Sequence, residues 1–138
     1  MLLRDKVCII TGAASLRGIG YATAELFAEH AAKVVVADLT MNEQVAAEIR
    51  TSIGTKVGRP AELHSVCCDI GSFDDCRTLF ESAASRFGRV DCLVNCAAVV
   101  KPQSFLSITE KDYDFVVDVN LKGAFNLCKA AVEHFVAD

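Results

Sequence analysis

Four short apolar runs separated by longer amphipathic runs constrain the fold more than any other feature of this sequence. The short runs cover residues 6–11, 33–38, 63–69 and 90–95, and they carry apolar side chains on both faces. Strands of this kind are buried in a parallel sheet with helices on both sides. The runs between them place apolar residues three and four apart, as crossover helices do. The chain is therefore predicted to be an α/β protein with a doubly wound parallel sheet.

Capping residues predict where the helices begin and end. Gly54 and Gly88 follow the second and third amphipathic runs, and a residue without a Cβ takes the left-handed cap at least cost. Ser72 and Thr109 precede the next helical patterns and are predicted N-caps. The last helical pattern runs from Thr109 to about residue 137.

Length and composition indicate one globular domain. The chain has 138 residues, of which 52% are apolar and 23% charged, so residues 1–138 are assigned to a single, partial domain with a surface loop at 54–62. The net charge is −4 and the 14 basic residues are scattered, which argues against nucleic acid or an anionic membrane as partners. No apolar run is long enough for a signal peptide or a membrane span, so we expect a cytoplasmic protein.

The seven cysteines do not indicate a metal site or a disulfide framework. Their number is odd, they form no C-x-x-C pair, and no histidine stands at ligand spacing. Most of them are predicted to be small buried hydrophobic residues.

The ten residues Thr11 to Gly20 read TGAASLRGIG and join the first strand to the first helix. Gly12 is expected to permit the tight turn, Gly18 to let the backbone approach a pyrophosphate, and Gly20 to allow close packing of helix on strand. Asp38 follows Gly20 by 18 residues, at the end of the second strand, where a carboxylate accepts hydrogen bonds from ribose hydroxyls. This arrangement favours dinucleotide binding over a turn that merely connects two elements. A P-loop is excluded because no Lys-Ser or Lys-Thr follows the last glycine.

Four motifs in the same order resemble the short-chain dehydrogenase/reductase family along the whole chain. They are TGAASLRGIG, CDI at 68–70, VNCAA at 94–98 and VNLKGAF at 119–125. The resemblance implies a Rossmann-like sheet with strand order 3-2-1-4 that lacks the C-terminal half of the family fold. It also implies an NAD(P)-dependent oxidoreductase.

The same resemblance assigns roles to individual residues. Asp69 and Ile70 would border the adenine, Asn95 and Ala97 would support the sheet and the cofactor, and Asn120 would be the framework asparagine that helps hold a proton-relay water. The full set of implied cofactor-binding residues is Gly12, Ser15, Arg17, Gly18, Ile19, Gly20, Asp38, Asp69, Ile70, Asn95 and Ala97.

The sequence departs from the family pattern at two places, and it gives two opposing signals on the cofactor. Five residues separate Gly12 from Gly18, more than in the commonest family form, so the turn is expected to be longer. The strand-end motif has Ala98 where the family has glycine, and the added Cβ could crowd the cofactor. Asp38 would repel a 2′-phosphate, whereas Arg17 stands where NADP-dependent relatives carry a basic residue. We expect NAD rather than NADP, since a carboxylate close to a phosphate costs more than a solvated loop arginine recovers.

The catalytic serine, tyrosine and lysine of the family are expected to have no counterpart in this sequence. Tyr21 and Tyr113 are followed one helical turn later by Glu25 and Val117, and neither is a lysine. We therefore expect the N-terminal half of an oxidoreductase, truncated or partial, that acts on a hydroxyl or carbonyl substrate when complete. One alternative is a non-catalytic nucleotide-binding or regulatory module that pairs with a full-length relative, and another is a chain that keeps the fold and binds nothing specific.

Self-association or pairing with such a relative is the expected consequence of two uncovered surfaces. The fourth strand would be a bare edge, and the last helix would expose the face that carries Val119, Phe125, Val132 and Phe135.

Overall fold

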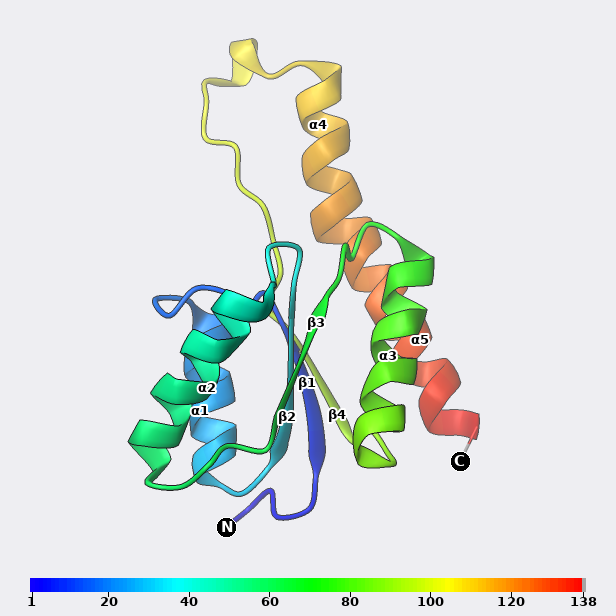
Figure 1. The fold of residues 1–138 in the computed structure, drawn as a ribbon. Helices are drawn as coiled ribbons and strands as arrows, with labels where there is room; N and C mark the ends of the chain where they lie inside the picture. The colour runs from blue at the N-terminus through cyan, green and yellow to red at the C-terminus, as the bar shows by residue number, and fades with distance from the viewer. Residues whose placement is uncertain (138) are drawn as a thin grey trace.

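Four parallel strands form one sheet in the order β3-β2-β1-β4 (Figure 1). The computed structural model describes residues 1–137. The strands are β1 (Val7–Thr11), β2 (Lys33–Asp38), β3 (Leu63–Cys67) and β4 (Cys92–Asn95). The predicted Rossmann-like order is confirmed. Because Thr11 pairs with both Ala37 and Asn95, the carboxyl ends of the three strands β1, β2 and β4 lie at one edge of the sheet.

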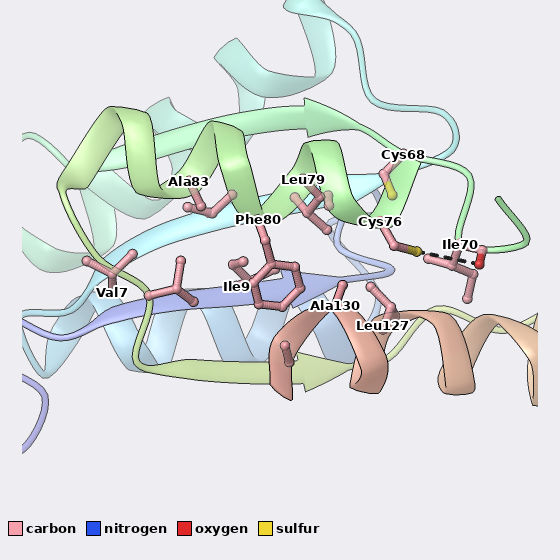
Figure 2. Close-up of a cluster of buried hydrophobic side chains, with 14 residues drawn as sticks. Val7, Ile9, Cys68, Ile70, Cys76, Leu79, Phe80, Ala83, Leu127 and Ala130 are labelled. Atoms are coloured by element: carbon pink, nitrogen blue, oxygen red, sulfur yellow. Dashed lines mark hydrogen bonds between the residues drawn. The ribbon is translucent and has the colours of Figure 1, made fainter. Parts of the chain in front are cut away.

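Helices cover both faces of the sheet and enclose two hydrophobic cores. Helices α1 (Ile19–Glu29) and α2 (Glu43–Val57) pack on one face, and α3 (Phe73–Phe87) and α5 (Gly123–Ala137) on the other (Figure 1). Alternate residues of β1 supply the two cores, since successive strand side chains point to opposite faces. Cys8 and Ile10 belong to the α1–α2 side. Val7 and Ile9 belong to the α3–α5 side (Figure 2).

Three predicted helix caps are confirmed and one is wrong. The Ser72 Oγ accepts a hydrogen bond from Asp75 N, Thr109 caps the next helix in the same way, and Gly88 ends α3 with a φ of 85°. Helix α2 instead runs past Gly54 to Val57 and ends at Gly58, whose φ is 71°. Gly58 offers the left-handed residue one turn later, so the hydrogen-bond ladder continues through Gly54. The loop predicted from residue 54 therefore starts four residues later.

The long helical pattern after Thr109 is one continuous path made of three pieces. Helix α4 (Glu110–Val117) leads into the π-helical η2 (Asp118–Lys122) and then into α5, and a short 3₁₀ turn, η1 (Phe105–Ser107), precedes them. The sequence pattern did not predict the π-helical segment. Helix α4 and the chain before it project beyond the sheet (Figure 1).

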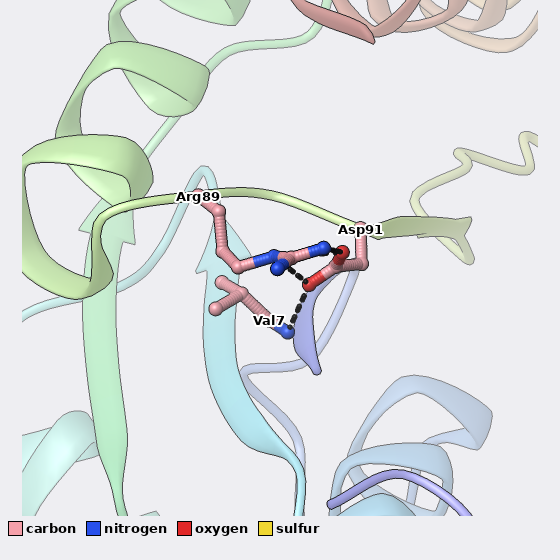
Figure 3. Close-up of polar contacts among 3 residues, drawn as sticks. All are labelled: Val7, Arg89 and Asp91. Carbon is pink, nitrogen blue, oxygen red and sulfur yellow. Dashed lines mark hydrogen bonds and ion pairs between the residues drawn. The ribbon is translucent and has the colours of Figure 1, made fainter. Parts of the chain in front are cut away.

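An ionised aspartate ties together the amino ends of β1 and β4. Asp91 Oδ2 accepts a hydrogen bond from Val7 N at 2.9 Å, and the Arg89 Nε donates to both carboxylate oxygens at 2.9 and 3.0 Å (Figure 3). Burial raises the pKa of Asp91, but the hydrogen bonds from Arg89 and Val7 outweigh it and lower the pKa below its ordinary value. This carboxylate therefore stabilises the register of the two strands in its charged form.

The cysteines are less buried than predicted. Cys8, Cys68 and Cys76 are buried, Cys92 and Cys96 are half-buried, and Cys67 and Cys128 are exposed. The prediction that most are buried is wrong because β4 is an edge strand and Cys128 lies on the outer face of α5. All seven are free thiols. Within residues 1–137, no group of three or more potential metal ligands comes together, and no helix has the length and apolar character needed to cross a membrane.

Candidate functional site

A pocket of about 330 Å³ lies at the carboxyl ends of the strands and collects five of the predicted cofactor-binding residues. These are Gly12, Asp38, Asp69, Ile70 and Ala97. Open α/β sheets bind ligands at the carboxyl ends of their strands, at the point where the strand order reverses. Ser15, Arg17, Gly18, Ile19, Gly20, Asn95 and Asn120 are outside the pocket's lining.

Gly12 and Gly20 have the packing roles predicted for them. Gly12 has a φ of 69°, and a Cβ there would stand 2.6 Å from Ala97 N. A Cβ on Gly20 would stand 2.8 Å from the Gly12 carbonyl carbon. Both positions are therefore closed to any side chain, because the turn, the first helix and the segment after β4 meet there.

The lengthened glycine turn is closed by local hydrogen bonds. Gly18 N donates to Ser15 O at 2.9 Å, and Arg17 N donates to the Ser15 Oγ at 3.3 Å. Gly18 is the N-cap of α1, and no acidic residue stands in the first turn of this helix. The first-turn N–H groups have no acceptor within the helix, which suits an anion. The predicted approach of Gly18 to a pyrophosphate stays a prediction, as do the roles of Ser15, Arg17 and Ile19, which are exposed.

Asp38 joins the glycine turn to the loop after β2. Its Oδ2 accepts a hydrogen bond from Ala14 N at 3.1 Å, and its Oδ1 accepts from both the backbone N and the Oγ1 of Thr40 at 3.1 Å. An ionised carboxylate has about four acceptor positions, so one position remains for a ligand hydroxyl. Sequence reasoning missed Thr40, although a threonine two residues after a strand-end aspartate is a recognisable turn signal.

Asp69 and Ile70 form the wall of the pocket that comes from the loop after β3. Asp69 is exposed, and its Oδ1 accepts from Gly71 N at 2.9 Å. Ile70 is buried, and its carbonyl accepts a hydrogen bond from the Asn126 Nδ2 at 2.9 Å. A Cβ on Gly123 would stand 2.6 Å from Ile70, so α5 lies directly behind this wall. Sequence reasoning missed Asn126 and Gly123, because their contact joins elements more than fifty residues apart.

Asn95 holds the end of β4 against β1. Its Oδ1 accepts a hydrogen bond from the buried Thr11 Oγ1 at 2.6 Å and from Ala97 N at 3.2 Å. The predicted support of the sheet is thus observed in the contacts of Asn95, while its part in holding a cofactor stays a prediction. Thr11 was missed as a site residue, although a hydroxyl in the last position of a buried strand needs a partner.

Asn120 fastens the segment after β4 to the π-helical turn. Its Oδ1 accepts from Val99 N at 2.8 Å, and its Nδ2 donates to Val99 O at 2.9 Å. Asn120 and Val99 also line a second pocket of about 390 Å³ against α4. The side-chain amide is engaged with backbone, and its predicted relay water stays a prediction.

The exposed helix face predicted from the sequence is mostly confirmed. Phe125, Val132 and Phe135 are exposed, but Val119 is half-buried, packs against the α3–α5 core and lines the first pocket. The prediction for Val119 is wrong because the π-helical segment turns this side chain inward.

Comparison with known proteins places these features in a family. A family model described as enoyl-(acyl carrier protein) reductase matches residues 12–138. The chain is 33% identical over 136 residues to 3-oxoacyl-[acyl-carrier-protein] reductase FabG of Thermotoga maritima, covering 99% of this chain and 52% of that protein. It is 37% identical to tropinone reductase-like 1 of Erythroxylum coca, covering 97% of this chain and 47% of that protein.

Solved structures agree with these relatives. A short-chain dehydrogenase from Mycobacterium avium superimposes with a TM-score of 0.88 at 29% identity, over 99% of this chain and 49% of that one. The 3-ketoacyl-(acyl-carrier-protein) reductase from Brucella melitensis, solved with NADH, gives a TM-score of 0.81 at 34% identity, over 96% of this chain and 51% of that one. The chain spans about half the length of the curated relatives it matches. The match to the family model, the strand order and the glycine turn agree with one another. The chain therefore belongs to the short-chain dehydrogenase/reductase family.

Proposed function

We propose that this chain is the cofactor-binding half of a cytoplasmic short-chain oxidoreductase and that it binds NAD in preference to NADP. The single observation that carries the proposal is the Asp38 carboxylate, fixed at the mouth of the strand-end pocket by Ala14 N and Thr40 with one acceptor position left. That position suits a ribose hydroxyl. A 2′-phosphate there would face a fixed negative charge at short range.

The residues present fit the adenosine and pyrophosphate part of a dinucleotide. Gly12 leaves a cradle that a Cβ would fill, and the first turn of α1 offers unpaired N–H groups without a competing carboxylate. Asp69 and Ile70 supply the adenine wall. When bound, the nicotinamide supplies hydride transfer to or from a carbonyl or hydroxyl carbon. Among the residues of this chain, Asn120 would fix the segment that follows β4 near the substrate, through its two hydrogen bonds to Val99.

The chain by itself is proposed to bind cofactor without turning over a carbonyl substrate. Neither Tyr21 nor Tyr113 has a lysine one helical turn later to lower its pKa, so no pair in this sequence can exchange a proton with the substrate oxygen in the manner of the family. Substrate binding and the complete activity are proposed for a longer protein that includes this half, and not for the chain alone.

Titration calorimetry on the chain tests the cofactor assignment. NAD and ADP-ribose should bind with similar affinity, because the adenosine-diphosphate portion makes the contacts, and NADP should bind more weakly. Tighter binding of NADP than of NAD would show that Arg17, and not Asp38, governs the site.

The second candidate is a non-catalytic nucleotide-binding module that pairs with a full-length relative. The exposed apolar face of α5 favours it, because Phe125 and Val132 are 62% and 56% exposed. Turnover assays of a full-length relative with and without this chain separate the two candidates. A change in that relative's rate that follows the chain's concentration supports the module.

A further inference from the structure

Strand β3 has one edge that pairs with β2 and one edge that is open. It stands last in the sheet, and β2 is its only neighbouring strand within residues 1–137. Val34 N donates to Glu62 O and Cys68 N donates to Asp38 O, so the backbone groups of the even-numbered residues point toward β2. Successive residues of a parallel strand point their backbone groups to alternate sides. The N–H and C=O groups that point to the open edge therefore belong to the odd-numbered residues Leu63, Ser65 and Cys67.

Two arginines stand on either side of this open edge. Arg50 comes from α2 and Arg86 from α3, and these helices cover opposite faces of the sheet with β3 between them (Figure 1). Both residues are exposed, and within the described part of the chain neither forms an ion pair with a carboxylate. Burial lowers the pKa of His64 in β3, and the positive charges of Arg86 and Arg50 lower it further. Both guanidinium groups therefore lie near the same point of the strand.

His64 adds a hydrogen-bond donor at this point. Its Nε2 lies 2.8 Å from the Ser82 Oγ of α3, and this contact holds the ring on the α3 face. When the hydroxyl donates to Nε2, the neutral ring carries its proton on Nδ1 and can donate it to a ligand. The amino half of β3 thus combines open backbone groups with a histidine and two guanidinium groups. The chain as a whole has a net charge of −4, so this cationic cluster is not a general property of its surface.

We propose that the open edge of β3 binds an extended acidic segment of a partner protein, which adds to the sheet as a further strand. Main-chain hydrogen bonds to the open backbone groups supply affinity in this mode of recognition, and side chains supply specificity. Successive side chains of a strand point to opposite faces. Two consecutive carboxylates of the segment therefore meet one arginine each, Arg50 on one face and Arg86 on the other. The edge thus selects neighbouring acidic residues over acidic residues that stand two apart.

A second copy of this chain is a poorer occupant of the same edge. An antiparallel ladder between two β3 strands, centred on Ser65, would bring the arginines and the His64 of both copies together around one pair of strands. Like charges placed across an interface oppose association. An acidic segment instead neutralises Arg50 and Arg86, so charge favours a partner of different sequence.

Hydrogen exchange and NMR titration with two peptides of equal composition test the proposal. The first peptide is Thr-Val-Thr-Glu-Glu-Val-Thr, and the control, Thr-Val-Glu-Thr-Glu-Val-Thr, keeps both carboxylates on one face. The first peptide should slow exchange of the Ser65 and Cys67 amides, whereas the amides of His64 and Val66, which already face β2, should change little. The control peptide should bind about threefold more weakly, because one exposed ion pair is missing.

Arginine variants test the flanking charges. Arg50→Gln and Arg86→Gln should each raise the dissociation constant of the first peptide about threefold and remove its advantage over the control peptide. Arg77→Gln is the matched control, because it removes an exposed positive charge from α3 beside Asp74, and it should leave the affinity unchanged.

Three results would overturn the proposal. They are unchanged exchange at Ser65 with millimolar peptide, equal binding of the two peptides, and an effect of Arg77→Gln as large as that of Arg86→Gln. Protection of Ser65 that grows with the concentration of the chain alone would assign the edge to a second copy and overturn it as well. This inference does not depend on cofactor binding, so its failure would leave the calorimetric test of NAD intact.

Discussion

Replacing Asp38 by alanine should destabilise the chain even without a cofactor. The carboxylate accepts three hydrogen bonds, one from Ala14 N and two from Thr40, each at 3.1 Å. The N–H of Thr40 is exposed and regains water, but that of Ala14 is half-buried between the glycine turn and β2. Leaving such a donor unpaired costs about 1–3 kcal/mol. We expect the free energy of unfolding to fall by this amount.

Asp38→Asn separates the positioning role from the charge. The single amide oxygen can accept from Ala14 or from Thr40, and the NH₂ group then faces a donor on the other side. The free energy of unfolding of Asp38→Asn should lie between those of the wild type and Asp38→Ala. Asp69→Ala is the matched control, because Asp69 is an exposed carboxylate at the same pocket and accepts one local hydrogen bond from Gly71 N.

Urea unfolding and hydrogen exchange, both on the cofactor-free chain, measure these effects. The Ala14 amide should exchange faster in Asp38→Ala than in Asp69→Ala. In a separate titration with NAD, calorimetry should show that Asp38→Ala weakens NAD binding by about 1–3 kcal/mol. If Asp38→Ala unfolds at the wild-type urea concentration with unchanged exchange at Ala14, then Asp38 is not a link between the glycine turn and β2.

Three further changes probe other contacts of the chain, two at the site and one at the opposite ends of the strands. Gly20→Ala should lower stability by about 1–3 kcal/mol in urea, because its Cβ would stand 2.8 Å from the Gly12 carbonyl carbon, and a wild-type midpoint would contradict this. The lowered pKa of Asp91 contributes stability that is complete above the unfolded-state value of about 3.8 and is lost as the pH falls through the folded value. Asp91→Asn should therefore flatten the acid limb of the stability curve below about pH 4. Asn120→Ala should speed amide exchange at Val99 selectively, and unchanged protection there would mean that the amide clamp is unimportant.

Sequence reasoning predicted the elements whose signal is local. The Ser72 and Thr109 caps and the buried central strands β1 and β2 depend on neighbours within a few residues, and they stand as predicted. The edge strands β3 and β4 are shorter than the predicted runs 63–69 and 90–95 and are mostly half-buried, because each has a neighbouring strand on one side only. Gly54 was misassigned because two glycines, Gly54 and Gly58, lie one turn apart, and the pattern alone did not show which one takes the left-handed conformation.

Apart from the local contact of Thr40 with Asp38, most of the contacts that sequence reasoning missed join distant parts of the chain. Asn126 reaches Ile70 over 56 residues, and Asn120 reaches Val99 over 21. The inward turn of Val119 depends on a π-helical segment, which carries no periodic signal of its own. The candidate site was thus predictable where it follows a motif and not where an amide side chain crosses from one element to another.

Cofactor binding and any pairing through α5 should be independent of each other, because they involve opposite faces of this helix. Asn126 and Gly123 support the Ile70 wall of the pocket from the inner face, while Phe125 points outward. Two sites are coupled only if one ligand shifts an equilibrium that the other also senses. Because Phe125 lies on the face of α5 opposite to the pocket, Phe125→Glu should leave NAD affinity within about twofold, less than about 0.5 kcal/mol. The measurement is NAD titration of Phe125→Glu and wild type over a range of protein concentrations. A tenfold difference would show that α5 transmits a change on its exposed face to the Ile70 wall of the pocket.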